Sequence, residues 1–331
     1  MKDALAVPDP RPPRDATSAG PRVASVTVAF NPEIARLAQQ LRALRGQVDD
    51  IVIVDNGSDP PLERLFAEAA PNHPEMREAA PRMVVLPANL GIARGLNVGI
   101  AAAAKNGAAF VVLLDHDSVP EPGMVAHLLE VHVRSAGTRE SPAVAAIGPR
   151  VSDSRDKRDY PFVRLGWLRN RHVHCEGARD TVVPCDFLIS SGKLLSLDAF
   201  EKVGPFEDDL FIDSVDREWC FRARSRGFAL YGACAAQLDH RLGDRRRAAP
   251  FGLELVVHSP ERIYYMTRNR ALLYRRAYVP LKWKVKDFLR VLAKFAATMM
   301  FVPPRREYAR MTWLAIRHAL AGRGGKLDSG R

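Results

Sequence analysis

Apolar runs of strand length alternate with amphipathic stretches of helix length over the first third of the chain. The runs are VASVTVAF from Val23, DIVIVD from Asp50, MVVL from Met83 and FVVLLD from Phe110. Helical spacing follows these strands, and the helix after the third, from about Ile92 to Lys105, is rich in alanine. Apolar strands separated by helices indicate a parallel sheet covered on both faces. The sequence therefore predicts an α/β fold.

The apolar periodicity weakens after Val144. A strand candidate, VAAIGPRV, a polar basic insertion at 152–180 and the run TVVPCDFLISSGKLLS predict mixed sheet and loop. From Leu197 to about Gly227 a helical segment surrounds the acidic cluster FEDDLFIDSVDREWCFR, and AQLDHRLG follows a short strand. From Glu261 onward the chain is helical and basic, with Trp, Tyr and Phe interleaved.

Polar side chains collect where the apolar strands end. In open parallel sheets, ligands bind outside the carboxyl ends of the strands. We therefore expect one crevice to contain the polar residues of all four strand ends. They are Asn31, Asp55, Asn89, Asp115 and Asp117.

Asp115-His116-Asp117 stands directly after VVLL, at the tip of a buried strand where alternate side chains point the same way. Two carboxylates so placed suit Mg²⁺ or Mn²⁺, which bind carboxylate oxygens together with substrate phosphates. A solvated turn is the alternative, because Asp-x-Asp is common by chance. The place of this motif after the last of four successive βα units favours the metal site.

The formal charge of +11 over 331 residues implies an anionic partner. Nucleic acid, an acidic membrane leaflet and a phosphorylated small molecule all fit that charge. The basic residues cluster in the insertion and in the C-terminal stretch, whereas a nucleic-acid-binding protein is expected to show a recognisable module early in the fold. This distribution argues against a nucleic-acid partner.

The cysteines form no CxxC pair and have no zinc-ligand spacing, so buried free thiols in a reduced, cytosolic compartment are the simplest interpretation. Residues 1–21 contain Pro, Arg and Asp without the apolar core of a secretory signal, and we expect a disordered leader there. No uncharged apolar stretch reaches about 18 residues, so no spanning helix is expected. The cysteines are Cys175, Cys185, Cys220 and Cys234.

Six stretches resemble, in the expected order, the family 2 glycosyltransferases of GT-A fold and, within them, the bacterial rhamnosyltransferase-like group. They are VASVTVAFNP, IVIVDNGS, NLGIARGLNVGI, VVLLDHDS, FIDSVDREWCFR and DHRLG. The resemblance implies an inverting transfer from a nucleotide diphosphate donor, with Mn²⁺ or Mg²⁺ as cofactor. It favours rhamnose from dTDP-rhamnose, moved to a hydroxyl of a glycan or lipid-linked glycan in cell-surface polysaccharide synthesis.

The resemblance, together with the residue pattern of the C-terminal stretch that lies outside it, divides the chain. We expect a GT-A catalytic domain at 22–258, with a mostly parallel sheet flanked by helices, a nucleotide-binding half at 22–120 and an acceptor half at 121–258. Residues 259–331 are expected to form a C-terminal helical basic extension. Its apolar and cationic residues suit peripheral contact with the inner, cytoplasmic face of a membrane. An ordinary amphipathic helix packed on the catalytic domain is the alternative.

The resemblance also assigns donor-binding residues. Asp55 is expected to hydrogen-bond the pyrimidine base of the donor, with Asn31 lining the same pocket, although a strand-end aspartate that caps the next turn is an equal alternative. Asn89, Gly91 and Asn97 are expected to hold the loop and helix start near the nucleotide, where glycine lets backbone approach the ligand closely. Helix packing would also explain the glycines. Asp115 is expected to contact the donor as well as the metal.

An inverting displacement needs a general base for the acceptor hydroxyl. The match onto VDREWCFR places that base at Asp216. Val215 stands where the family has the first acid of a pair, so Asp213 remains the second candidate. Glu218 and Trp219 are expected to bind the acceptor, with a surface acid as the alternative for Glu218.

Three more residues take their roles from the resemblance alone. His240, in LDHRLG, matches a histidine that joins the Asp pair in holding the metal, and an imidazole ligand favours manganese. Arg268 and Asn269 are expected to contact phosphates of the acceptor. A nucleotidyltransferase is the alternative enzyme, but AFNPEIARL lacks the Gly-rich basic loop that would hold a triphosphate.

Overall fold

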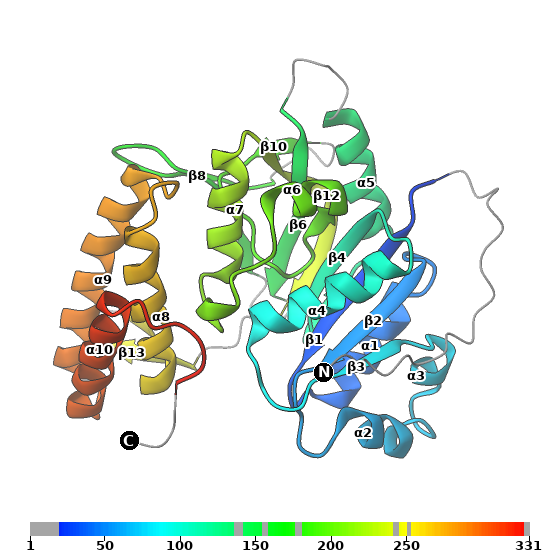
Figure 1. Ribbon diagram of the computed structural model, residues 1–331, viewed down its shortest axis with the longest axis horizontal. Helices are drawn as coiled ribbons and strands as arrows, with labels where there is room; N and C mark the ends of the chain where they lie inside the picture. The colour runs from blue at the N-terminus through cyan, green and yellow to red at the C-terminus, as the bar shows by residue number, and fades with distance from the viewer. Residues whose placement is uncertain are drawn as a thin grey trace.

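The computed structural model describes residues 20–135, 142–153, 158–175, 181–240, 245–249 and 253–327. Nearly all of the leader expected at 1–21 lies outside these ranges. The described strands form one large sheet and two small hairpins, and helices cover both faces of the large sheet (Figure 1). The expected α/β class is confirmed.

The N-terminal half follows the βα order expected from the apolar runs. Its elements are β1 (Val23–Ala29), α1 (Ile34–Leu44), β2 (Asp50–Asp55), α2 (Leu62–Ala69), α3 (Pro74–Glu78), β3 (Arg82–Val85), α4 (Ile92–Lys105) and β4 (Phe110–Asp115). The four strands are parallel and lie in the order β4-β1-β2-β3. Their carboxyl ends therefore meet at one edge, where the polar strand-end residues were expected.

The second half is mixed, as its weaker periodicity predicted. Its elements are β5 (Ser118–Pro120), α5 (Met124–Ser135), β6 (Val144–Asp153), β7 (Arg158–Tyr160), β8 (Phe162–Arg164), β9 (Arg171–Val173), β10 (Val182–Pro184), β11 (Leu194–Ser196), α6 (Leu197–Val203), a 3₁₀ turn η1 (Asp208–Leu210), α7 (Val215–Ser225) and β12 (Ala229–His240). Strand β11 runs antiparallel between β4 and β6, and β12 pairs with β6 in parallel. β12 has 12 residues, longer than the short strand expected, because AQLDH continues it.

Side chains alternate between the two faces of the sheet, as the two-residue period of a strand requires. In β2, Val52 and Val54 belong to the core under α4 and α7, whereas Ile51 and Ile53 belong to the core under α1 and α5. Gly99 lets α4 lie close to β1, because a Cβ on Gly99 would come within 2.4 Å of a Val26 methyl carbon. The two packed faces hold the carboxyl edge of the sheet rigidly.

The C-terminal region holds a small hairpin and three long helices, which lie together at one side of the molecule (Figure 1). Its elements are β13 (Arg245–Ala249), β14 (Leu253–Val257), α8 (Pro260–Tyr274), α9 (Leu281–Phe301) and α10 (Arg305–Leu320). Tyr264 and Tyr265 of α8 pack with α10 and with Phe211, and Trp283 of α9 joins the main core. The extension is thus packed on the sheet-containing unit. None of the described helices is both long enough and apolar enough to cross a membrane.

The expectation of four free thiols is wrong. Cys175 and Cys234 form a disulfide with a Cα–Cα distance of 5.4 Å across 59 residues of sequence. The pairing depends on β12 passing beside the end of β9, which the spacing of the cysteines does not reveal. Cys185 and Cys220 are buried free thiols, as expected, and burial raises the pKa of both.

Candidate functional site

A cavity of about 610 Å³ opens where β1 and β4 end and α7 begins. Residues from the carboxyl edge of the sheet, from the acidic cluster before Trp219 and from α8 line it. Seven of the residues singled out from the sequence line it together. They are Asn89, Gly91, Asp115, Asp117, Asp213, Asp216 and His240.

Asp115, Asp117 and His240 place one carboxylate oxygen or ring nitrogen each within 4.8 Å of one another. His240 Nδ1 lies 3.2 Å from an Asp117 oxygen, and His240 Nε2 lies 3.8 Å from an Asp115 oxygen. The histidine reaches the pair because β12 runs antiparallel to β5, with His240 opposite Ser118. A residue 122 positions after Ser118 therefore faces the turn that ends β4.

Two buried side chains of α1 hold the backbone of this turn. Arg36 Nε donates to the Asp117 carbonyl at 2.8 Å, and its guanidinium also donates to the Asp239 carboxylate at 2.8 Å. Gln40 donates to the carbonyls of Asp115 and Ser118 at 2.7 and 2.6 Å. These bonds tie the turn and the end of β12 to one rigid helix, so the three metal-type ligands are held in place by groups behind them.

The electrostatics of the cluster suit a cation. Burial alone would raise the pKa of Asp117, but the hydrogen bond and charge of His240 hold that pKa below its ordinary value. Burial alone would lower the pKa of His240, but Asp117 and Asp115 raise it. The carboxylates thus already stabilise positive charge at the imidazole, and a divalent cation would offer them a stronger partner.

The acidic loop before α7 has an unusual backbone. Phe211, Asp213 and Ser214 have φ angles of 60°, 64° and 67°, in the left-handed region that costs most residues free energy. The Asp213 carboxylate accepts from Arg262 at 3.3 and 3.4 Å. Asp216 lies in the first turn of α7 and accepts from the backbone N–H of Arg217 at 2.7 Å.

Arg268 and Asn269 hold that loop from α8 and do not line the cavity, contrary to the phosphate contact expected of them. Both are fully buried at 0% exposure. Asn269 Nδ2 lies 2.7–2.8 Å from the carbonyls of Leu210, Ile212 and Asp213. Arg268 donates to the carbonyl of Leu210 at 3.1 Å, and further to those of residues 209 and 325. These side-chain N–H groups already donate to backbone carbonyls, so a phosphate of the sugar acceptor does not reach them in this structure.

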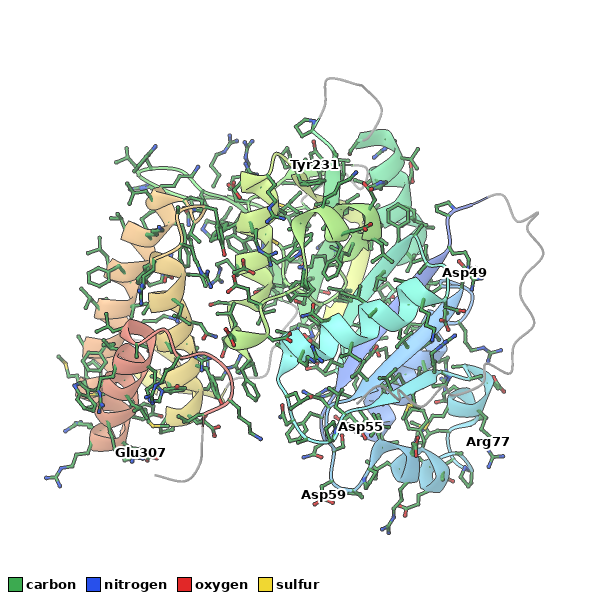
Figure 2. The ribbon with its side chains drawn as sticks, in the orientation of Figure 1. Asp49, Asp55, Asp59, Arg77, Tyr231 and Glu307 are labelled. Atoms are coloured by element: carbon green, nitrogen blue, oxygen red, sulfur yellow. A yellow bond between two sulfur atoms is a disulfide. The ribbon has the colours of Figure 1, made fainter. Side chains whose placement is uncertain are left out.

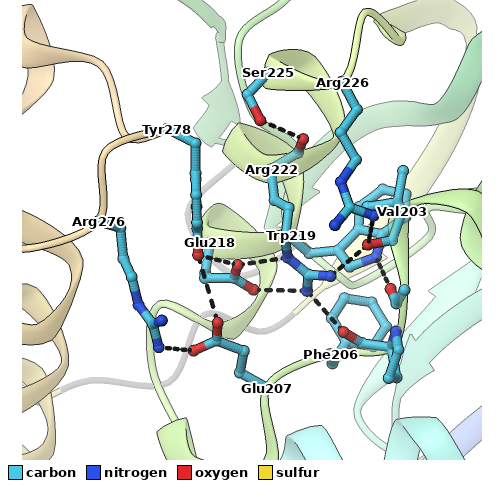
Figure 3. Close-up of polar contacts among 12 residues, drawn as sticks. Val203, Phe206, Glu207, Glu218, Trp219, Arg222, Ser225, Arg226, Arg276 and Tyr278 are labelled. Atoms are coloured by element: carbon cyan, nitrogen blue, oxygen red, sulfur yellow. Dashed lines mark hydrogen bonds and ion pairs between the residues drawn. The ribbon is translucent and has the colours of Figure 1, made fainter. Parts of the chain in front are cut away.

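Glu218 and Trp219 are also placed away from the cavity, contrary to the acceptor contact expected of them. Glu218 is 0% exposed and accepts from Arg222 at 2.7 and 3.0 Å and from the Tyr278 hydroxyl at 2.6 Å (Figure 3). Trp219 is 0% exposed and its Nε1 donates to the Gly204 carbonyl at 2.9 Å. Successive residues of a helix are about 100° apart, so Glu218 points roughly opposite to Asp216. Both side chains therefore belong to the core under α7.

Asp55 and Asn31 do not line the cavity, although both were expected to contact the donor there. Asp55 lies near the start of α2 (Figure 2) and is 1% exposed. Its two carboxylate oxygens accept from the backbone N–H groups of Ser58 at 2.8 Å and Leu62 at 2.9 Å. Asn31 accepts from the backbone N–H of Asp59 at 2.9 Å. The capping alternative describes Asp55 in this structure, because both of its oxygens are occupied.

The stretch NLGIARGLNVGI divides between cavity and packing. Asn89 accepts from the backbone N–H of Gly91 at 3.0 Å and from the side chain of Asn56 at 3.2 Å, and both Asn89 and Asn56 line the cavity. Gly91 has φ 90°, and a Cβ there would lie 2.5 Å from the Phe211 carbonyl. Asn97 instead holds the segment before η1 by exchanging bonds of 2.8 and 2.9 Å with the backbone of Phe206. It does not line the cavity.

Sequence reasoning missed several residues of the wall. Two of them carried a signal, because Asn56 follows a predicted strand in DNGS and Ser191 lies in the polar LISSGK turn. Ser191 donates its hydroxyl to the Asp115 carboxylate. The arginines carried no signal, since the spacing along α7 and α8 does not tell which face meets the cavity. The missed residues include Asn56, Ser191, Phe211, Arg217, Arg262 and Arg270.

Two solved structures share this architecture. GalNAc-T7 with UDP, GalNAc and Mn²⁺ aligns with 92% of this chain at a TM-score of 0.57 and 10% identity, and the chain spans 56% of that protein. The 1-349 form of S. aureus TarS, in complex with UDP-GlcNAc, aligns with 90% of this chain and 81% of its own at a TM-score of 0.51 and 14% identity. At such low identity these likenesses concern the fold, and they confirm the GT-A type.

Two sequence comparisons concern the family. The dTDP-rhamnosyl transferase RfbF of Shigella flexneri is 28% identical over 301 residues, which cover 90% of this chain and 95% of the relative. The family model described as glycosyl transferase family 2 matches residues 25–204, more than half of the chain. This match includes the strands and the Asp-x-Asp turn on which the cavity is built. The chain therefore belongs to glycosyl transferase family 2.

Proposed function

We propose that this chain is an inverting glycosyltransferase that moves rhamnose from dTDP-rhamnose to a hydroxyl of a glycan or lipid-linked glycan in cell-surface polysaccharide synthesis. Family membership and the likeness to the dTDP-rhamnosyl transferase RfbF support this activity. The observation that carries it is that one cavity is lined by the cluster of Asp115, Asp117 and His240 and by Asp216. A metal-type site and a candidate base thus share one space of sugar-nucleotide size.

Asp115, Asp117 and His240 are the residues that would hold a divalent cation. Two carboxylates and an imidazole fit Mn²⁺ best. Mg²⁺ also fits the carboxylates, but it accepts an imidazole ligand less readily. The presence of Mn²⁺ with UDP in the GalNAc-T7 structure supports this choice. When bound, the cation would neutralise charge that develops on the diphosphate leaving group.

Asp216 is the better candidate for the general base. Its carboxylate bonds only the adjacent backbone N–H within the described part of the chain, whereas that of Asp213 is paired with Arg262. In the proposed step the acceptor oxygen attacks the anomeric carbon and its proton passes to Asp216. The bond from that carbon to the diphosphate oxygen breaks, and the diphosphate leaves with the electron pair. The configuration inverts.

On the donor side, we propose that Asn89, Gly91 and Asp115 contact the nucleotide sugar directly. TarS was solved with a UDP-sugar on the same fold, which supports a nucleotide-sugar donor. Asn31, Asp55 and Asn97 then act behind the site by fixing the loops that surround it. We expect substitutions in this second group to loosen donor binding through loop order.

We further propose that α9 contacts an anionic membrane surface from the periphery. Its outward face carries large apolar side chains at helical spacing, and Phe288, Leu289 and Leu292 are 51%, 59% and 50% exposed. Exposed Arg290 and Lys294 lie among them, and the single acid of the helix, Asp287, is buried. Apolar side chains flanked by cations suit anionic lipid, whereas a second copy of the same helix would bring like charges together.

Sedimentation with vesicles tests the membrane contact. The full chain should co-sediment with phosphatidylglycerol vesicles more than with phosphatidylcholine vesicles, and Phe288→Glu should reduce that binding. Trp167→Glu offers a control, because Trp167 is 71% exposed and lies outside α9. Equal sedimentation of Phe288→Glu and the unsubstituted protein would contradict the assignment to α9.

Release of nucleotide from a panel of nucleotide sugars tests the function. We expect release from dTDP-rhamnose that depends on Mn²⁺ or Mg²⁺ and increases with a suitable acceptor. Release of pyrophosphate from a nucleoside triphosphate and a sugar phosphate would instead support a nucleotidyltransferase. Salt-sensitive retention of oligonucleotide with neither activity would support a nucleic-acid-binding protein.

A further inference from the structure

Arg217 lines the cavity directly beside Asp216, yet the proposed reaction gives it no role. Its side chain makes no hydrogen bond or ion pair with any residue in the described part of the chain, and its Nε is buried without a partner. The guanidinium carbon instead lies 5.1 Å from the centroid of the Phe187 ring and 5.7 Å from that of Trp283.

A guanidinium in this state is poised for an anion. The Nε–H of Arg217 is a buried donor without an acceptor, which is costly, and contact with aromatic rings offsets only part of that cost. The two rings also hold the planar group in one place, so little freedom is lost when its donors meet a carboxylate or phosphate. An anionic group entering the cavity would therefore find a preformed site at Arg217.

The distribution of charge identifies which anion. Arg262 and Arg270 line the same wall, but each already has an acid, Asp213 at 3.3 Å and Asp287 at 3.1 Å. Arg217 is the cation of this wall that contributes an uncompensated charge. The proposed metal ligands Asp115, Asp117 and His240 would hold the diphosphate of the donor, and Arg217 is not among them. A second anion that enters beside the candidate base must come with the acceptor.

We propose that Arg217 binds a phosphate group of the acceptor, an inference that rests on the proposed glycosyltransferase function and deepens it. The bidentate geometry of arginine suits phosphate oxygens. The adjoining ring of Trp283 belongs to α9, whose opposite face carries the exposed apolar side chains. A sugar joined to lipid through phosphate would present its phosphate at Arg217 while its lipid reaches the membrane on the far side of α9. The acceptor class is thus a phosphorylated glycan carrier.

Binding of inorganic phosphate to the full chain tests this site. The protein is titrated with phosphate in EDTA, so that no cation recruits phosphate to the acidic cluster, and tryptophan fluorescence reports binding beside Trp283. Arg217→Met keeps a flexible apolar side chain beside the rings and removes the charge. We expect phosphate affinity to fall by about 10-fold or more. Arg64→Met is the control, since Arg64 is 69% exposed, pairs with Glu68 and lies outside the cavity.

A parallel titration separates acceptor from donor. Binding of dTDP with Mn²⁺ is measured in the same variants, and the loss caused by Arg217→Met should be smaller for dTDP than for phosphate. Equal losses would assign Arg217 to the diphosphate of the donor and overturn the proposal. Phosphate binding that Arg217→Met and Arg64→Met weaken alike, or none at all, would also overturn it. If Arg217→Met fails to fold by circular dichroism, Arg217→Lys decides in its place, with weaker phosphate binding expected from loss of the planar fork. Metal-dependent nucleotide release tests the enzyme function independently.

Discussion

Asn269→Ala tests how the strained loop before α7 is held. The amide has two N–H donors and three carbonyl oxygens within 2.8 Å, and the side chain is fully buried. Its removal leaves the part-buried carbonyls of Ile212 and Asp213 without this donor, whereas the Leu210 carbonyl keeps its bond from Arg268. A buried unsatisfied acceptor costs about 1–3 kcal/mol, so we expect a loss of about 2–4 kcal/mol in the free energy of unfolding. The melting temperature should fall by roughly 5–10 °C.

The same substitution should affect turnover in the protein that remains folded. Without the clamp, the left-handed residues Phe211, Asp213 and Ser214 can relax, and Asp216 moves with them. A displacement of about 1 Å at a catalytic group can cost about 100-fold in rate, so kcat should fall by about that factor at a temperature well below melting. Binding of dTDP with Mn²⁺ should change much less, because α1 and the pairing of β12 with β5, and not this loop, hold the proposed metal ligands.

Asn106→Ala is the matched control. Its amide donates to the Asp50 carboxylate at 2.9 Å, at the end of α4 away from the cavity. We expect a loss of about 1 kcal/mol in the free energy of unfolding and normal kcat. The reasoning is refuted if Asn269→Ala melts with the unsubstituted protein, or if it loses stability and retains full kcat.

Four further outcomes follow from the site and the core. Asp216→Asn should abolish transfer while dTDP binding persists, and full activity in steady-state assays would move the base to the other loop acid. Asp117→Ala should weaken Mn²⁺-dependent dTDP binding by calorimetry, and an unchanged metal requirement would count against the cluster. Glu218→Ala should lower the free energy of unfolding by about 3–5 kcal/mol, because it leaves the largely buried Arg222 guanidinium without its ion-pair partner. A loss confined to acceptor KM would restore the acceptor role. If Cys175 and Cys234 are paired, a thiol reagent should modify no cysteine in the native protein and two cysteines after denaturation. After denaturation and reduction it should modify four.

The parts of the fold that depend on local pattern were predictable. Strands β1, β2 and β4 and helix α4 begin and end close to the predicted residues, because apolar periodicity is read within one element. The Asp-x-Asp turn was likewise predicted from its place at a strand end. Its histidine partner was not, except by resemblance, because His240 arrives through the register of β12 with β5.

The parts of the site that depend on which helix face is buried were not predictable. Asp216 and Glu218 are two residues apart and both carry a carboxylate, but packing turns one to the cavity and the other to a largely buried arginine. The resemblance implied that Arg268 and Asn269 bind phosphate, yet their N–H groups donate to backbone carbonyls of a loop about 60 residues earlier. The sequence likewise did not decide whether Asp55 binds the donor base or caps the next turn, because its hydrogen-bond donors are fixed only by the fold. Long-range acceptors decide such cases.

A crystal structure with Mn²⁺ and dTDP is the most direct test of the shared cavity. We predict an anomalous scattering peak bonded by Asp115, Asp117 and His240, with the diphosphate beside it and open space for a sugar between the β-phosphate and Asp216. Manganese bound elsewhere, or dTDP seated outside the wall that contains Asp216, would contradict the proposed catalytic site.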